Sequence, residues 1–444
     1  MAGIARPTEN PGYYLPVDEE ALAGLLDEPV DWRYKGRPAV RRPLTVGELG
    51  AERWNLLAGD LLLPAMVLKQ SALEHNIALV ARYCDEHGVS LAPHGKTTMA
   101  PQLFARQLDA GAWGITAATV AQVAVYRHFG VRRVVLANEL VEPAALRWVA
   151  DELESEPSFD FYCLVDSVAA VGAMTKALSG RGATRQIQVL VEVGVQGGRA
   201  GCRTLEQAKE VAEAVAASPM LALAGVEGFE GVIGGPDLET TLAEVDEFLE
   251  RARALTLDLA RGGAFAGRAE IIVTAGGSAY FDRVVAVLGP LWDLDVPVRV
   301  VLRGGCYVTH DSGFYDRLSP LGERGDDERL RPALEAWGAV LSRPEPELAI
   351  VGLGKRDVPF DLGLPVPWHV AARGGALRDA GGELTVIALN DQHAFVRLAP
   401  GAELAVGDLV GCGISHPCLA FDRWPLVLLV DDDYTVIGGI RTFF

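Results

Sequence analysis

A regular alternation of short apolar runs and helical patterns between residues 89 and 303 constrains the fold of this 444-residue chain more than any other feature. Eight strand-like runs occur there, at 90–93, 113–117, 132–137, 159–165, 187–193, 221–228, 271–275 and 298–303. Helical patterns separate consecutive runs, and several runs are continuously apolar, as parallel strands covered on both faces are. Because eight βα units fit one closed architecture, the pattern predicts an α/β fold with a (β/α)8 barrel.

The hydrophobic pattern changes after Gly304. The helical period ends there, and strand-like alternation continues between turns rich in Gly, Pro and Asp. Strand-like runs lie at 336–344, 347–354, 383–390, 393–400 and 425–432. Alternation of this kind indicates a mostly antiparallel β domain. We therefore divide the chain into a lead-in segment that packs on the β domain, a barrel and a C-terminal β domain, at 1–60, 61–310 and 311–444.

Composition excludes several classes of partner. The net charge is −19 and Lys and Arg do not cluster, which argues against nucleic acid, since phosphate binding requires a basic surface. Charges or glycines interrupt the apolar runs before the roughly 20 residues that a membrane span needs. Six cysteines without a framework spacing, and no signal peptide before them, indicate a reducing, cytoplasmic location.

The segment VSLAPHGKTTMAP at 89–101 places a lysine, Lys96, where the first barrel strand ends and a helix begins. Active sites of such barrels lie at the C-terminal ends of the strands. Lysine amines are catalytic chiefly as Schiff-base nucleophiles, so a carbonyl partner such as pyridoxal phosphate is indicated. The simple alternative is a surface lysine beside a helix start.

A candidate phosphate site follows the seventh strand, in TAGGSAYF at 274–281. Gly276 and Gly277 allow close approach of the backbone to an anion, and Ser278 can donate its hydroxyl. Barrels commonly hold phosphate at this position in the strand order. An ordinary glycine-rich βα turn would also explain the sequence.

A second constellation lies in the β domain, in GISHPCLAFD at 413–422. His416 and Cys418 are two residues apart, so an extended strand would direct both side chains to one face, as two ligands of one metal ion require. A plain buried cysteine beside an unrelated histidine is the alternative.

Several segments together resemble the D-serine dehydratase / D-threonine aldolase family, the fold-type III pyridoxal phosphate enzymes with an alanine racemase-like barrel. They lie at 93–123, 191–201, 225–231, 274–281 and 302–311. The resemblance implies that Lys96, in a Pro-His-x-Lys-Thr run that also contains His94, is the Schiff-base lysine. It further places Arg199 at the family's Arg-x-Gly, although Gly194 replaces the usual Asp nearby and Thr98 the usual His.

The resemblance also bears on the two histidine segments and on the end of the eighth strand. Metal-dependent members bind a divalent ion with a His-x-Cys or His-x-Asp pair, which falls on His416 and Cys418, and thiolate favours zinc. His393 matches a segment near the active site, with a structural histidine as the alternative. Cys306 and Tyr307 follow the eighth strand, where either could line the pocket, and Tyr307 is a candidate cofactor contact.

By resemblance, His-x-Cys belongs to the dehydratase branch. We therefore expect a lyase that depends on pyridoxal phosphate and Zn²⁺ and converts a D-β-hydroxy amino acid, such as D-serine, to a 2-keto acid and ammonia. Retro-aldol cleavage to glycine and an aldehyde is the nearest alternative, followed by a racemase and a non-catalytic pyridoxal phosphate carrier. The family also implies a homodimer in which each β domain completes the other subunit's site.

Overall fold

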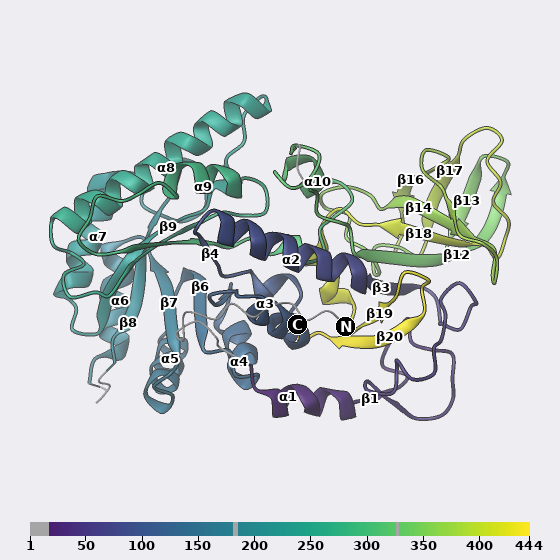
Figure 1. The fold of residues 1–444 in the computed structure, drawn as a ribbon, viewed down its shortest axis with the longest axis horizontal. Coiled ribbons are helices and arrows are strands. Elements are labelled where there is room, and N and C mark those ends of the chain that lie inside the picture. Colours follow the sequence, from purple (N-terminus) through teal and green to yellow (C-terminus); the bar gives the residue numbers. More distant parts are fainter. Residues whose placement is uncertain (1–16, 181–184, 326–327) are drawn as a thin grey trace.

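The structure is a computed structural model that describes residues 17–180, 185–325 and 328–444. A curled sheet wrapped by helices forms one part of the molecule, and an antiparallel β domain forms the other (Figure 1). Helix α2 (Gln70–Glu86) runs across the front of both in this view. The predicted combination of a barrel and an antiparallel β domain is thus confirmed.

The barrel sheet has eight strands, and each is parallel to its neighbours in the order β4-β11-β10-β9-β8-β7-β6-β5. Its strands are β4 (Ser90–Leu91), β5 (Ile115–Ala117), β6 (Arg133–Glu139), β7 (Asp160–Val165), β8 (Ile187–Val193), β9 (Leu221–Gly228), β10 (Ile271–Ala275) and β11 (Val298–Leu302). Each coincides with one of the predicted runs. The intervening helices are α3 (Pro101–Asp109), α4 (Val120–His128), α5 (Pro143–Ser155), α6 (Val168–Leu178), α7 (Leu205–Ala217), α8 (Leu238–Arg261) and α9 (Phe281–Leu288).

The stretch that follows β4 closes the barrel between β11 and β5. The Ala92 amide donates to the Leu302 carbonyl at 2.8 Å, and the Thr116 amide donates to the Pro93 carbonyl at 2.8 Å. His94 then forms an isolated parallel bridge with Thr116. Regular pairing stops early in this strand because Pro93 has no amide hydrogen to donate.

Apolar side chains fill the inside of the barrel. One buried cluster takes residues from all around the sheet, namely Ala92, Trp113, Val135, Tyr162, Leu164, Leu190, Ala224, Ile272 and Val301. A second, larger cluster lies between the strands and the helices and continues into the β domain. The interior is therefore a packed core, and the opening for chemistry lies at the ends of the strands.

The β domain is built on strands that pair mostly antiparallel, in the order β15-β14-β18-β12-β13-β17-β16. They are β12 (Leu334–Glu345), β13 (Leu348–Val351), β14 (Val366–Ala371), β15 (Arg378–Asp379), β16 (Leu384–Leu389), β17 (Ala394–Leu398) and β18 (Leu409–Gly413). Two further strands, β19 (Leu426–Val430) and β20 (Val436–Arg441), pair with each other. Strand β3 (Ala65–Lys69), which precedes the barrel in sequence, pairs with both β12 and β19.

Most of the described lead-in segment packs on this β domain, but its start contacts the barrel, where the Asp18 amide donates to the Phe129 carbonyl at 2.9 Å; residues 1–16 lie outside the described residues. The segment contains α1 (Glu19–Gly24), β1 (Pro29–Val30) and β2 (Leu44–Thr45). It shares a buried cluster with the β domain, in which Leu49 and Leu56 lie together with Trp337 and Leu409. The Arg441 side chain also donates to the Glu28 carboxylate at 2.6 Å.

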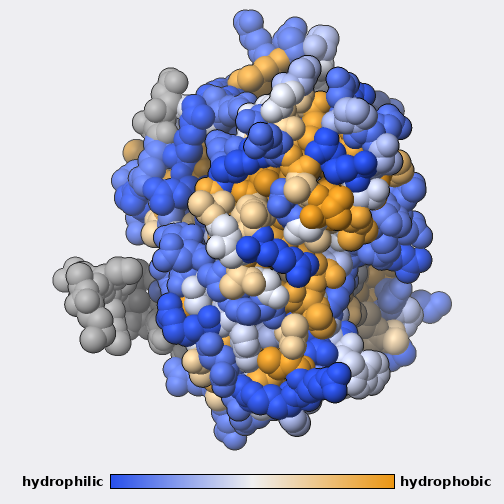
Figure 2. Space-filling view, turned by 90° about the vertical axis from the view of Figure 1, so that its right-hand side faces the viewer, coloured by the Kyte–Doolittle hydropathy of each residue, from blue (hydrophilic) through white to orange (hydrophobic). Residues whose placement is uncertain are grey.

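The outer face of the β domain mixes polar and apolar side chains (Figure 2). Exposed apolar residues of this domain include Leu341 and Val406, which are 52% and 62% exposed. Among the helices of the described residues, we find none whose length and apolar character would suit a membrane span.

The contact between β9 and β10 leaves no room for a side chain at Gly225. A β-carbon there would lie 1.7 Å from the Ile272 carbonyl oxygen. We expect Gly225→Ala to lower the free energy of unfolding by about 3 kcal/mol or more, because the two strands must separate. Chemical denaturation followed by circular dichroism measures this loss.

Gly172→Ala is the matched control, because a β-carbon at this helical position meets no atom within 4 Å. This variant should be unchanged or more stable by about 1 kcal/mol. Equal stability of the two variants would contradict the tight contact between β9 and β10.

Candidate active site

Lys96 lies in a short 3-10 helix, η2 (Gly95–Thr97), between the closing stretch of the barrel and α3. This confirms that the lysine stands where a strand ends and a helix begins. Glycine is required before it, because a β-carbon at Gly95 would lie 2.6 Å from the Tyr126 hydroxyl. The tight contact fixes the backbone from which the Lys96 side chain reaches into a cavity of about 430 Å³.

That cavity gathers residues from the barrel and from the β domain. Of the predicted site residues, His94, Lys96, Gly277, Ser278, His416 and Cys418 line it. Other lining residues are Thr97, Gln122, Phe229, Arg303, Gly305, Cys306, Tyr315, Leu419, Asp422 and Phe444. The structure thus brings the lysine, the glycine-rich loop and the His-x-Cys pair together, although they lie up to about 320 residues apart in the chain.

Arg199 lies beside this cavity without lining it. It lines a small neighbouring hollow with Glu192 and Phe229, and its guanidinium lies 3.5 Å from the Glu192 carboxylate. The glycine that replaces the family's Asp has a steric reason, because a β-carbon at Gly194 would lie 2.2 Å from the Arg203 guanidinium. A cofactor contact by Arg199 stays a prediction.

Two other candidates point elsewhere. Tyr307 is buried, and its hydroxyl accepts a hydrogen bond from the Gln107 side chain of α3 at 2.8 Å. His393 is exposed in the turn between β16 and β17. Neither lines the cavity, so the roles considered for them remain untested predictions.

The glycine-rich loop after β10 makes a contact that the sequence analysis did not anticipate. The amides of Gly276 and Gly277 donate to the carboxylate of Glu230 at 3.0 and 2.6 Å. Glu230 belongs to the 3-10 helix η3 (Glu230–Val232) and is fully buried. Ser278 accepts from the Cys306 amide at 3.2 Å. Two amides of the loop thus have an acceptor within the chain, and a phosphate contact by the loop stays a prediction.

Positive charge gathers around His94. Burial and the nearby cations Lys96 and Arg303 lower the pKa of His94 well below its ordinary value. His94 Nδ1 and Arg303 Nε are buried and have no hydrogen-bond partner among the described residues. Arg303 also donates to the Gly228 carbonyl at 2.9 Å and pairs with the buried Glu227. Unpaired buried donors and cations fit an anionic ligand with ring heteroatoms, as pyridoxal phosphate is.

The local structure of the His-x-Cys pair differs from the predicted extended strand. The two residues do not lie on an extended strand, because residues Pro417–Leu419 form the 3-10 helix η5 after β18. Pro417 fixes its own φ and favours the first position of a helical turn, which explains the difference. The interpretation as a strand was wrong, and yet both side chains line the same cavity.

His416 is oriented by a carboxylate. Its Nδ1 lies 2.6 Å from Asp361 Oδ2, which leaves Nε2 for another partner. Burial by itself lowers the pKa of His416, but hydrogen bonds and charge interactions with Cys418 and Asp361 raise it to about 9. A histidine whose second nitrogen donates to a carboxylate is the usual arrangement for a metal ligand.

Cys418 is surrounded by donors. Its Sγ lies 3.4 Å from Cys306 Sγ and 3.3 Å from Thr97 Oγ1. The hydrogen bond from Cys306, aided by His416 and Thr97, lowers the pKa of Cys418 well below its ordinary value despite burial. A thiolate beside an oriented imidazole suits a borderline-soft divalent ion. Within the described ranges, however, no three His, Cys, Asp or Glu side chains already form a metal-binding group.

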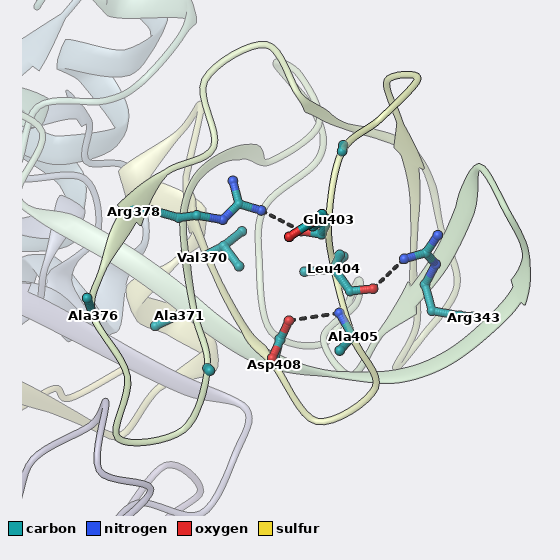
Figure 3. Close-up of a pocket in the computed structure, with 11 residues that line it drawn as sticks. Arg343, Val370, Ala371, Ala376, Arg378, Glu403, Leu404, Ala405 and Asp408 are labelled. Atoms are coloured by element: carbon teal, nitrogen blue, oxygen red, sulfur yellow. Dashed lines mark hydrogen bonds between the residues drawn. The ribbon is translucent and has the colours of Figure 1, made fainter.

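A second hollow of about 580 Å³ lies within the β domain and does not involve Lys96 (Figure 3). Its two arginines are engaged with backbone carbonyls: Arg378 donates to Glu403 at 2.5 Å and Arg343 donates to Leu404. Its other lining residues are mostly apolar, and none is a lysine, histidine or cysteine. The Lys96 cavity is therefore the candidate active site, although it is the smaller of the two.

Two family models match the chain, one over the barrel and one over the β domain. The chain matches the family model "Alanine racemase, N-terminal domain" over residues 68–270 and the family model "Putative serine dehydratase domain" over residues 333–430. Lys96 falls in the first match, and His416 and Cys418 fall in the second.

Individual relatives are lyases by name. The chain is 28% identical to D-threonine aldolase of Arthrobacter sp. over 347 residues, which cover 77% of this chain and 81% of that protein. It is 31% identical over 141 residues to D-threo-3-hydroxyaspartate dehydratase of Delftia sp. (strain HT23), which cover 31% of this chain and 35% of that protein. The crystal structure of D-threonine aldolase from Filomicrobium marinum has the same fold, with a TM-score of 0.70 and 23% identity over 86% of this chain and 95% of that chain.

Replacing Glu230 tests its role in the glycine-rich loop. Glu230→Ala leaves two buried amides without their acceptor, so we expect the free energy of unfolding to fall by about 2 kcal/mol. Glu230→Gln keeps an acceptor oxygen and should lose less. Denaturant unfolding without added cofactor gives both values, and equal losses in the two variants would contradict a role for the accepting oxygen.

Proposed function

Because this chain belongs to the D-serine dehydratase / D-threonine aldolase family of fold-type III pyridoxal phosphate enzymes, we propose that it is a pyridoxal phosphate- and zinc-dependent dehydratase. Its substrate would be a D-amino acid with a β-hydroxyl, such as D-serine, and its products a 2-keto acid and ammonia. The observation that carries the proposal is that Lys96 and the pair His416 and Cys418 line one cavity.

The residues around Lys96 fit the cofactor. Lys96 would hold pyridoxal phosphate through its amine, and Ser278 of the glycine-rich loop, which lines the same cavity, would donate its hydroxyl to the phosphate, while the Gly276 and Gly277 amides donate to Glu230. His94 and Arg303 offer buried polar atoms to the ring. When bound, pyridoxal phosphate withdraws the electrons left by a bond broken at the substrate's α-carbon.

Lys96 is also the residue placed to move the proton. Its amine would act as the base when it is not bound to the cofactor, and it lines the cavity beside Thr97 and Gln122. The neighbouring His94 is disfavoured as the base, because burial and the cations around it keep its affinity for protons low. We therefore assign abstraction of the α-proton to Lys96.

The second half of the reaction concerns the β-hydroxyl. His416 and Cys418 would hold a divalent ion, with Asp361 orienting the imidazole. The ion supplies Lewis-acid assistance to a poor leaving group. Thiolate as the second ligand favours zinc over manganese or magnesium, and by family resemblance it points to dehydration.

Retro-aldol cleavage is the second candidate, favoured by one specific observation. The sequence similarity to the Arthrobacter D-threonine aldolase extends over 77% of this chain, whereas the sequence similarity to the Delftia dehydratase extends over 31%. Both reactions would use the same lysine and the same metal pair. The products distinguish them, since cleavage yields glycine and an aldehyde.

We also propose that the enzyme acts as a homodimer in a reducing, cytoplasmic compartment. All six cysteines are free thiols in the structure, which suits such a compartment. The cavity is lined by barrel and β-domain residues of the same chain. A partner's β domain would add residues to it, as the family resemblance implies.

A product assay tests the function. The purified protein is incubated with D-serine, D-threonine and D-threo-3-hydroxyaspartate, and ammonia, 2-keto acid, glycine and aldehyde are measured. We expect ammonia and keto acid in equal amounts, at least a tenfold loss on removal of metal by a chelator and recovery with Zn²⁺.

Lys96→Ala serves as the control, because it lacks the lysine amine that would bind the cofactor. This variant should give no product and no borohydride-stable attachment of the cofactor. Glycine and aldehyde as the products would establish the aldolase alternative. Turnover that a chelator leaves unchanged would contradict the metal role.

Asp361 should strengthen metal binding through His416. We expect Asp361→Asn to weaken Zn²⁺ affinity about 10–100-fold, because the amide holds the imidazole less firmly and makes it less basic. Competition with a chromophoric chelator measures the affinity. Asp391→Asn is the control, because the Asp391 side chain is 71% exposed, and this variant should leave the Zn²⁺ affinity unchanged. Equal affinities in the two variants would remove Asp361 from the site.

A further inference from the structure

Two cysteines from different parts of the fold meet at the metal pair. Cys306 begins the 3-10 helix η4 (Cys306–Val308) directly after β11, and Cys418 lies in η5 of the β domain. Their sulfur atoms are 3.4 Å apart. Cys306 is 3% exposed, and its amide donates to Ser278 Oγ, so its backbone is held in place.

The distance between the sulfurs is close to the one that a shared metal ion imposes. Zinc binds thiolate sulfur at about 2.3 Å, so two sulfur ligands of a tetrahedral ion lie about 3.8 Å apart. The observed contact differs from this by a few tenths of an ångström, which a small side-chain rotation supplies. No three such side chains already form a metal-binding group among the described residues, so these side chains must move toward a common point for an ion to bind.

The surroundings supply the remaining features of such a site. The Asp361 carboxylate accepts from His416 Nδ1, so Nε2 is the nitrogen left for a metal. Thr97 Oγ1 lies 3.3 Å from Cys418 Sγ and can donate to a bound sulfur. Two thiolates also balance the double charge of the ion in a partly buried cavity, which reduces the cost of desolvating it.

We propose that Cys306 is a third protein ligand of the metal, so that the ion binds to one nitrogen and two sulfurs, from His416, Cys418 and Cys306. This inference rests on the proposed metal-dependent function. Each thiol releases its proton to solvent as its sulfur binds, and nothing is oxidised or reduced. Three protein ligands leave one tetrahedral position for the substrate's hydroxyl, which is the arrangement of catalytic zinc sites.

Cobalt(II) reports the number of sulfur ligands directly. The full-length protein, kept reduced and loaded with its cofactor, is titrated with Co²⁺, and the sulfur-to-cobalt charge-transfer absorbance per bound ion is recorded as a difference spectrum. We expect Cys306→Ser and Cys418→Ser each to lose about half of this absorbance, and the double variant to lose all of it. Cys84→Ser, at a buried cysteine of α2, is the control and should match the parent protein.

X-ray absorption of the zinc-loaded protein gives a second, independent measurement. We expect two sulfur ligands in the parent chain and one in Cys306→Ser, at about 2.3 Å. Full absorbance and two sulfurs in Cys306→Ser would overturn the inference and leave the His416 and Cys418 pair intact. A parent protein that binds neither Co²⁺ nor Zn²⁺ would overturn the proposed metal dependence together with this inference.

Discussion

The backbone pairing of residues 90–94 with β11 and β5 is the constraint on which both the barrel and its candidate site depend. The Ala92 amide donates to Leu302 of β11, and the Pro93 carbonyl accepts from the Thr116 amide of β5. Lys96 lies two residues after His94, which forms the last bridge with β5. The direction in which the lysine leaves the barrel is therefore fixed by main-chain hydrogen bonds. A catalytic side chain on such a support needs little reorganisation when a ligand binds.

The second part of the site comes from the β domain, whose strands come from both before and after the barrel in the sequence. Strand β3 precedes the barrel but belongs to the β domain, where it pairs with β12 and β19. The barrel is thus inserted between strands of one sheet, and its two ends are tied to that sheet. This connection holds Cys418 of the β domain next to Thr97 and Cys306 of the barrel, and the cavity exists only where the two meet.

The barrel was predictable because its signal is repeated and local. Each of its strands is an apolar run between helical patterns, and the structure places all of them as expected. Strands β14, β18 and β20 were missed, since Pro367, Gly411, Gly413, Gly438 and Gly439 lower their resemblance to strands. The site was predictable only in part. Lys96 and Ser278 stand at strand ends, but Glu230 and Asp361 act through contacts that sequence spacing does not encode.

If a metal ion binds at His416 and Cys418 as proposed, its electronic character rather than the lysine would decide between dehydration and cleavage. Both reactions leave electrons at the α-carbon for the cofactor, and they differ in the fate of the β-hydroxyl. Retro-aldol cleavage requires the hydroxyl to lose its proton, which a strongly acidic ion promotes. Thiolate ligands, as Cys418 would be, donate more electron density than carboxylates, so they would moderate the acidity of the ion. A hydroxyl that keeps its proton and gains a second one from an acid would leave as water, so a metal site with thiolate ligands would favour dehydration.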